Sequence, residues 1–117
     1  MSAKAYALYG GIILLVLGVI GLLGGNKLLG LNSETLEDII HIVAGALLAW
    51  AGYRGGAGQA AMWSKVFGVV FLVVGLVGFF DNNIFGLFKQ GMGTIDNIVH
   101  LIYGALGVMA GWRSKAM

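Results

Sequence analysis

The sequence predicts an all-α fold, an integral membrane four-helix bundle built from two tandem helical hairpins that form an internal repeat. Three observations predict this class. Apolar residues make up 59% of the 117 residues and charged residues only 10%, whereas a soluble domain carries about 25% charged residues. Four apolar stretches are each long enough to cross a hydrocarbon core of about 30 Å. The second half of the chain also repeats the residue pattern of the first.

The repeat becomes visible when His41 is aligned with His100. The same alignment places Glu37 on Asp96, so each copy has an acidic residue one helical turn before its histidine. The alignment also matches Thr35 with Thr94, Gly45 with Gly104, Gly52 with Gly111 and Arg54 with Arg113, and a second alignment upstream matches Gly11, Gly18 and Gly21 with Gly68, Gly75 and Gly78. We therefore expect a first two-helix repeat at residues 1–54, a cytoplasmic Gly-rich linker at 55–64 and a second two-helix repeat at 65–117.

The four predicted spans cover residues 5–25, 36–53, 64–80 and 94–112. The first span is longer than the apolar segment of a signal peptide, and it has a counterpart in the third span, so we assign it to the fold. The third span follows the Gly-rich linker. The second and fourth spans follow Thr35 and Thr94, which are typical helix N-caps, and acidic residues occupy the first turn of each helix.

Basic and acidic residues separate onto opposite sides of the predicted bundle. One side carries Lys4, Arg54, Lys65, Arg113 and Lys115, and the other carries all five acids together with Lys27 and Lys89. By the positive-inside rule, the N- and C-termini are cytoplasmic. The net charge of +2 is small and dispersed, so we expect the lipid bilayer, and no nucleic acid, as a partner.

Each predicted span carries two glycines that lie two helical turns apart, and hence on one face. The pairs are Gly11 and Gly18, Gly45 and Gly52, Gly68 and Gly75, and Gly104 and Gly111. No hydrophobic effect drives helices together in lipid, and small residues allow the close backbone contact that holds them instead. We expect these glycines to be helix-packing residues, within the bundle or towards another protomer.

The repeated acid–histidine pairs are the candidate functional residues. Glu37, Asp38 and Asp96 lie in first helical turns, where capping and solvation at the outer interface explain them. His41 and His100 lie about one and a half turns inside their helices, one turn after Glu37 and Asp96. The simplest hypothesis is a neutral imidazole that donates a hydrogen bond to its acid or to a loop carbonyl, and so fastens the helix to the loop.

Two sharper hypotheses use both histidines together. In the first, His41 and His100 are cofactor ligands that bind a haem or chlorin axially. In the second, the histidines and their acids form a proton or cation relay. The second-shell partners or relay groups are then Glu37, Asp38, Asp96 and Asn97. The first and third spans contain no ionisable residue beyond their ends, which disfavours a complete path through one protomer, and no cofactor is required by the sequence.

Catalytic and metal-binding patterns are not apparent. The chain has no cysteine, so thiolate ligands are excluded. Two histidines and two carboxylates are suitable ligands in principle, but no His-x-x-x-His spacing supports a metal site. The serines lie near span ends or in loops, without a nucleophile motif around them. We therefore predict no metal, no catalytic residue and no enzymatic activity.

The stretch Asp96-Asn97-Ile98-Val99-His100-Leu101, followed by Gly104 and Gly111, resembles a known sequence pattern. The pattern is the Asp-Asn-x-x-His motif of a domain-of-unknown-function family of small four-helix prokaryotic membrane proteins. The first copy departs from it, with Glu37-Asp38 in place of Asp-Asn. The resemblance implies four helices and a prokaryotic cytoplasmic membrane, and it implies no activity.

The leading functional prediction is a small non-enzymatic integral membrane protein, a structural or accessory subunit that packs through its glycine faces. It would pack into a homo-oligomer or a larger membrane complex. The alternatives are a haem- or chlorin-binding membrane protein that uses His41 and His100, and a small proton or cation transporter whose polar lumen forms between protomers.

Overall fold

The computed structural model describes residues 2–23, 27–28, 31–32, 35–81, 83, 86 and 94–113. Within these residues the chain is an all-α, compact four-helix bundle, as predicted, with four helical spans that are long and apolar enough to cross a membrane. The bundle measures 40 × 29 × 21 Å. Its longest dimension is close to the thickness of a bilayer including headgroups, about 40–45 Å.

The first span is a continuous helix in three parts, which are α1 (Ala3–Ala5), the π-helical segment η1 (Tyr6–Gly10) and α2 (Gly11–Leu22). The other spans are α3 (Thr35–Tyr53), α4 (Gly56–Phe80) and α5 (Thr94–Arg113). Between α2 and α3, the short strands β1 (Lys27–Leu28) and β2 (Leu31–Asn32) pair in antiparallel fashion. Neither the π-helical segment nor this small ladder is predicted by the sequence pattern.

The predicted Gly-rich linker is mostly helical in the structure. Helix α4 already begins at Gly56, which has a positive φ of 83° that glycine adopts without strain. Ala60 and Ser64, which the prediction placed in the linker, are fully buried, and the Ser64 hydroxyl donates to the Ala3 carbonyl oxygen at 3.4 Å. Packing of these small residues against the start of the chain outweighs the low helix propensity of the glycines.

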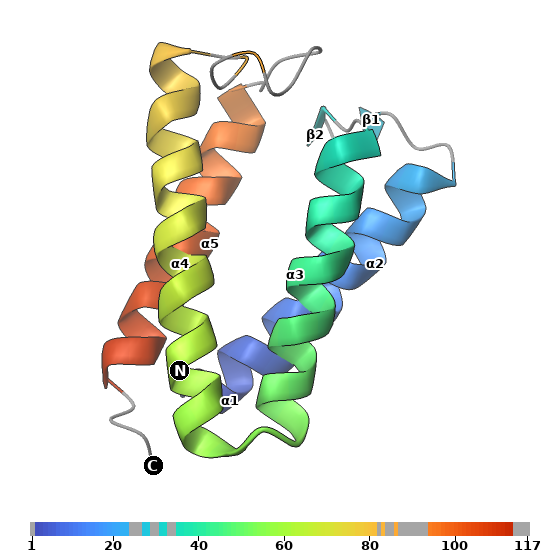
Figure 1. Cartoon of the computed structure of the whole chain (residues 1–117). Coiled ribbons are helices and arrows are strands. Elements are labelled where there is room, and N and C mark those ends of the chain that lie inside the picture. Colours follow the sequence, from blue (N-terminus) through green and yellow to red (C-terminus); the bar gives the residue numbers. More distant parts are fainter. Residues whose placement is uncertain are drawn as a thin grey trace.

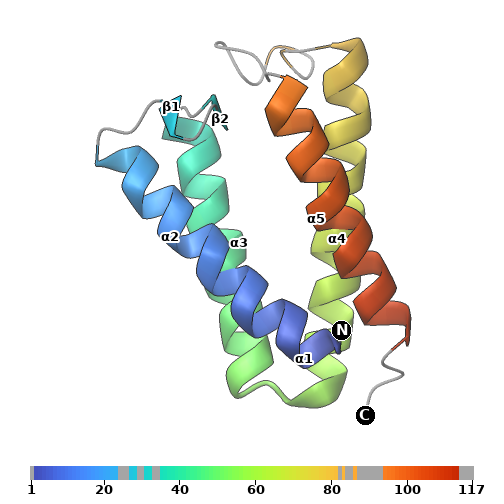
Figure 2. The same ribbon diagram turned by 180° about the vertical axis from the view of Figure 1, so that it is seen from behind.

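Figure 1 shows two antiparallel hairpins side by side, one formed by α2 and α3 and the other by α4 and α5. They are close together at the end where α1 begins and α5 ends, which we call the terminal end. They diverge towards the other end, where α3 and α5 begin, and Figure 2 shows the same divergence from behind. We call this second end the acidic end, because Glu37, Asp38 and Asp96 lie in the first turns of α3 and α5.

Glycine contacts hold each hairpin together at matching points of the repeat. A Cβ atom added to Gly45 would lie 2.6 Å from the Gly11 carbonyl oxygen, and one added to Gly104 would lie 2.7 Å from that of Gly68. Both distances are shorter than van der Waals contact, so the helix backbones touch here. The other four glycines of the heptad pairs, Gly18, Gly52, Gly75 and Gly111, also face the partner helix of their own hairpin.

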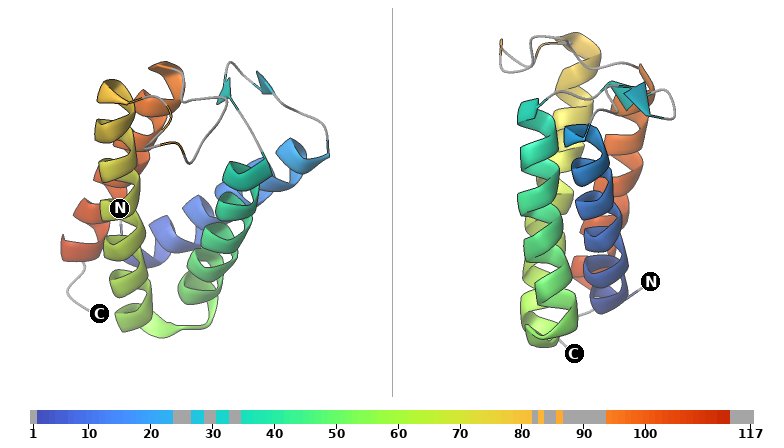
Figure 3. Two further views of the ribbon diagram at one scale, coloured as in Figure 1. Left: turned by 45° about the horizontal axis from the view of Figure 1, so that its top comes forward. Right: turned by 90° about the vertical axis from the view of Figure 1, so that its right-hand side faces the viewer.

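The buried apolar core between the hairpins lies mainly towards the terminal end. It combines small residues with aromatic ones: Ala3, Tyr6, Ala7, Leu14, Ala44, Leu48, Ala60, Ala61, Phe71 and Ala110, with Trp63, Phe67 and Tyr103 packed against them. Alanines let the helices of different hairpins approach closely in this half. In the right-hand view of Figure 3 the four spans run along roughly one direction, whereas the left-hand view shows the α2–α3 hairpin inclined to the α4–α5 hairpin.

Candidate functional site

Polar side chains at the acidic end point into the bundle and away from its surface. Glu37, Asp38 and Asp96 are only 5%, 3% and 3% exposed, and Asn97 and His100 are also buried. The prediction that the three acids are solvated at the outer interface is therefore wrong. Burial of a carboxylate in a membrane protein is costly without charged or hydrogen-bonding groups around it, so the surroundings of these acids decide what they do.

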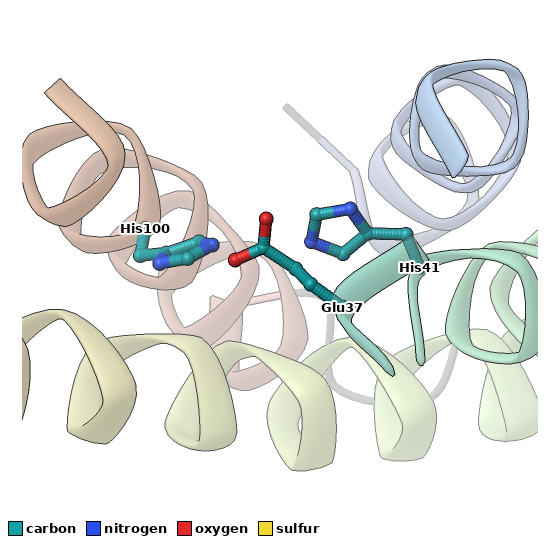
Figure 4. Close-up of side chains that lie close together, drawn as sticks. All are labelled: Glu37, His41 and His100. Atoms are coloured by element: carbon teal, nitrogen blue, oxygen red, sulfur yellow. The ribbon is translucent and has the colours of Figure 1, made fainter. Parts of the chain in front are cut away.

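Glu37, His41 and His100 form the centre of the site, which we call the histidine–glutamate cluster. Each offers a ligand atom, and these atoms all lie within 4.8 Å of one another. Figure 4 shows the Glu37 carboxylate between the two imidazole rings. Glu37 and His41 come from one turn of α3, and His100 comes from the corresponding turn of α5 in the other hairpin.

The two histidines approach each other across the boundary between the hairpins. Their ring centroids are 6.1 Å apart, and the ring planes make an angle of 67°. Within the described part of the chain, the buried Nδ1 atom of His100 has no hydrogen-bond partner. The carboxylates of Asp38 and Asp96 also interact electrostatically with His41. Both repeats thus contribute acidic groups to the surroundings of one imidazole.

Asp38 and Asn97 have a second role that the repeat makes recognisable. A Cβ atom on Gly21 would overlap the Asp38 carboxylate, and a Cβ atom on Gly78 would overlap the Asn97 side-chain amide. The two contacts are equivalent in the two hairpins. Each places a flat polar group over a glycine of the preceding helix, so the site needs the glycine backbone as well as the polar residue.

An aromatic layer borders the cluster on the side of the terminal end. We define it as Phe71, Tyr103 and Tyr6. The Phe71 ring stacks on His100 at 5.6 Å, lies 6.2 Å from the His41 ring and meets Tyr103 edge-on at 5.1 Å. The Tyr6 ring lies 5.1 Å from that of Tyr103.

The tyrosines of this layer each lie over a glycine of the other hairpin. The Tyr6 hydroxyl donates to the Tyr103 carbonyl oxygen at 2.9 Å, and it lies 2.6 Å from where a Cβ atom on Gly107 would be. The Tyr103 hydroxyl lies 3.1 Å from where a Cβ atom on Gly10 would be. Gly10 ends the π-helical segment, and π-helical turns are frequent next to functional sites.

Sequence reasoning missed all three residues of the aromatic layer. A signal for two of them exists in the repeat, at positions where the two copies differ. Tyr103 aligns with Ala44, Phe71 with Leu14 and Tyr6 with Trp63. A residue that packs within its hairpin has equivalent neighbours in both copies. A residue at the boundary between the hairpins instead lies near the equivalent residue of the other copy, and the two side chains have to fit together. In two of these pairs, Tyr103 with Ala44 and Phe71 with Leu14, a large aromatic group in one copy and a smaller group in the other satisfy that condition. The third pair, Tyr6 and Trp63, is aromatic in both copies and does not show the pattern.

The ligand atoms of the cluster form a recognisable donor set. Two imidazoles and one carboxylate are the ligands of many zinc sites with an open fourth position, and of some iron sites. Spacing along the sequence did not predict a metal site, because the third ligand comes from the other hairpin. The Asp38 and Asp96 carboxylates near His41 add negative charge around this donor set, which favours a cation.

Comparison with known proteins contributes no functional assignment. No protein-family model matches the chain, and neither a curated protein nor a solved structure matches it. The resemblance to the four-helix Asp-Asn-x-x-His family thus stays a prediction.

Proposed function

We propose that this integral membrane protein is a non-enzymatic metal-binding protein that holds one divalent transition-metal ion, with zinc as the reference ion, at the histidine–glutamate cluster. The single observation that supports this most strongly is the convergence of three ligand atoms from two hairpins within 4.8 Å. Imidazole nitrogen and carboxylate oxygen together suit zinc and other first-row metals better than they suit calcium or magnesium.

Charge supports a cation as the ligand. The cluster and its neighbours include the carboxylates of Glu37, Asp38 and Asp96, all of them buried. The Lys and Arg side chains that the structure describes, Lys4, Arg54 and Lys65, belong to α1, the α3–α4 connection and the first half of α4, towards the terminal end. A divalent ion would offset the negative charge of these buried carboxylates.

Binding requires a modest contraction of the cluster. A tetrahedral zinc ion with bonds of about 2.0–2.1 Å holds its ligand atoms roughly 3.3 Å apart. The ligand atoms therefore have to move closer by at most about 1.5 Å, which rotamer adjustments of Glu37 and His41 can supply. His41 is only half-buried, so its ring has room to move.

The haem or chlorin hypothesis fits this geometry less well. A macrocycle with two axial histidines has to pass between the two rings. Figure 4 shows the Glu37 carboxylate in that space, and the Phe71 ring contacts both imidazoles from the side of the terminal end. The chain would have to move the carboxylate and the phenyl ring aside to admit a porphyrin.

The hypothesis of packing into an oligomer through glycine faces also loses its main support. All eight glycines of the heptad pairs face a helix of their own hairpin, so these surfaces are already used within the chain. A partner protein would have to bind to the outward faces, which carry large apolar side chains such as Ile13, Val73 and Ile102 and which are equally suited to lipid.

Zinc titration of the purified protein tests the proposal. The full chain is purified in detergent with a tag that contains no histidine, stripped with EDTA and titrated with zinc by calorimetry. We expect one zinc per chain. We also expect Glu37→Gln, His41→Ala and His100→Ala each to weaken zinc binding by at least about 10–100-fold, the range known for loss of even an indirect partner.

A matched control is available at the same end of the bundle. Asp81 is half-buried, and its carboxylate accepts a hydrogen bond from the backbone N–H of Asn83 at 3.1 Å. Asp81→Asn removes the same charge as Glu37→Gln and should leave the affinity unchanged. The proposal fails if the wild-type chain binds no zinc, if the three ligand substitutions have no effect, or if the native protein shows a Soret band that His41→Ala abolishes.

A further inference from the structure

We infer that the metal site is accessible from one side of the membrane only. An ion enters and leaves the histidine–glutamate cluster from the acidic end, and the bundle does not conduct it across the membrane. This inference rests on the proposed metal binding and adds to it the direction of access. Three observations support it. The cluster is closed towards the terminal end, it lies close to the acidic end, and acidic residues are at the acidic end whereas aromatic and apolar residues are on the other side.

The cluster is closed towards the terminal end by the aromatic layer. In the α4–α5 hairpin, Gly75 lies beside Asn97 and Leu101, and Gly68 lies beside Gly104 and Gly107. Phe71 is midway between these glycines, so its ring lies about one turn closer to the terminal end than His100. From there it touches both imidazoles and Tyr103.

From Phe71 towards the terminal end, the described residues between the hairpins offer no carboxylate or imidazole that could bind a metal ion. The Tyr6 and Tyr103 rings contact each other, and the Tyr6 hydroxyl is engaged by the Tyr103 carbonyl oxygen. Beyond them, the alanines and Leu48 of the apolar core fill the space between the hairpins. A dehydrated divalent ion would meet only aromatic rings, methyl groups and hydroxyls along this route, which makes its passage very costly.

The cluster lies close to the acidic end. His41 and His100 are each six residues from the start of their helices at Thr35 and Thr94, which corresponds to about 9 Å along the axis. The end of α3 at Tyr53 is twelve residues from His41, or about 18 Å. Glu37, Asp38 and Asp96 belong to the first turns of these helices, so the acidic residues are at this end of the bundle, where they attract cations.

Sidedness of zinc loading in sealed vesicles tests the inference. The chain contains no cysteine, so Asn83→Cys at the acidic end gives a single thiol on an exposed residue, and a membrane-impermeant maleimide reports the fraction of chains with the acidic end outward. Ser2→Cys, near the N-terminus, should give the complementary fraction. A preparation of mixed orientation is exposed to external zinc and passed through a desalting column, and the bound zinc per chain is measured.

We expect the loaded fraction to equal the fraction of chains with the acidic end outward, and external EDTA to remove all of the bound zinc. A zinc indicator trapped in the lumen should show no more uptake than in protein-free vesicles. Loading of all chains regardless of orientation, or accumulation of zinc in the lumen, overturns the inference. Zinc binding in detergent is measured on the same sample: its absence contradicts the proposed function itself, whereas binding in detergent without sidedness contradicts only the direction of access.

Discussion

His41 and His100 occupy equivalent positions of the two repeats, and their rings meet at 6.1 Å between centroids across the boundary of the two hairpins. A residue near a pseudo-twofold axis lies beside its own counterpart, so duplication of one histidine yields a pair. The pair is not symmetric, because Glu37 reaches between the rings (Figure 4) while its counterpart Asp96 is one methylene shorter. This difference gives a site with one central carboxylate.

Zinc affinity should depend on pH in a defined direction. The imidazole and carboxylate ligands must be deprotonated to bind a metal, so binding releases protons. Affinity is therefore expected to fall as the pH is lowered and to recover fully when the pH is raised again. Calorimetry in two buffers of different ionisation enthalpy measures the number of protons released. An affinity that does not change with pH would show that these groups are not the ligands.

The close backbone contacts within the hairpins should make Gly45→Ala and Gly104→Ala destabilising. A Cβ atom on either glycine would lie 2.5 Å from a backbone nitrogen of the facing helix, so the helices must separate, at a cost of about 1–3 kcal/mol or more. Gly58→Ala is the control, because a Cβ atom there meets nothing within 4 Å and alanine favours a helix. Thermal unfolding in detergent should show lower melting temperatures for the first two variants only.

Asp38→Asn should separate the packing role of this residue from its charge. In the second hairpin, Asn97 occupies the equivalent place over Gly78, so an amide is compatible with the packing. We expect the variant to unfold at nearly the wild-type temperature and to bind zinc a few-fold more weakly, because one carboxylate that acts on His41 is lost. Asp38→Leu is the contrasting variant and should lower the melting temperature. Equal affinities for wild type and Asp38→Asn would contradict an electrostatic role.

Removing the hydroxyl of Tyr6 or of Tyr103 should have different effects. The Tyr6 hydroxyl donates to the Tyr103 carbonyl oxygen, and Tyr6→Phe should cost about 0.5–1.5 kcal/mol. In the part of the chain that the structure describes, the buried Tyr103 hydroxyl has no hydrogen-bond partner, so Tyr103→Phe should be neutral or slightly stabilising. Unfolding measurements on both variants under identical detergent conditions make the comparison. A lower stability of Tyr103→Phe than of Tyr6→Phe would contradict the hydrogen bond from the Tyr6 hydroxyl to the Tyr103 carbonyl oxygen.

Both ends of the chain should be on the cytoplasmic side of the membrane. The basic residues Lys4, Arg54 and Lys65 lie towards the terminal end, and short basic segments remain in the cytoplasm. An impermeant thiol reagent applied to intact cells should therefore label Asn83→Cys and leave Ser2→Cys unlabelled until the cells are opened. Labelling of Ser2→Cys in intact cells would place the metal site at the cytoplasmic face.

Much of the architecture follows from the sequence because its causes are local or periodic. Apolar length alone predicts four spans, and the spacing of Gly11, Gly45, Gly68 and Gly104 marks the faces that turn out to touch within the hairpins. The linker was mispredicted because its structure depends on a contact between residues that are far apart in the sequence. Its glycines suggest a flexible chain, whereas burial of Ala60 and Ser64 against Ala3, a contact distant in sequence, makes it helical.

The sequence by itself determined that the chain belongs in a membrane, that it is a duplicated pair of helices and that each copy carries an acid one turn before a histidine. Only the tertiary structure decided that Glu37, His41 and His100 converge, that Asp38 and Asn97 lie over glycines, and that Phe71 and the two tyrosines close one side of the site. The physical reason is that periodicity defines the face of one helix. The distance between faces of different hairpins depends on which side chains can fit between them.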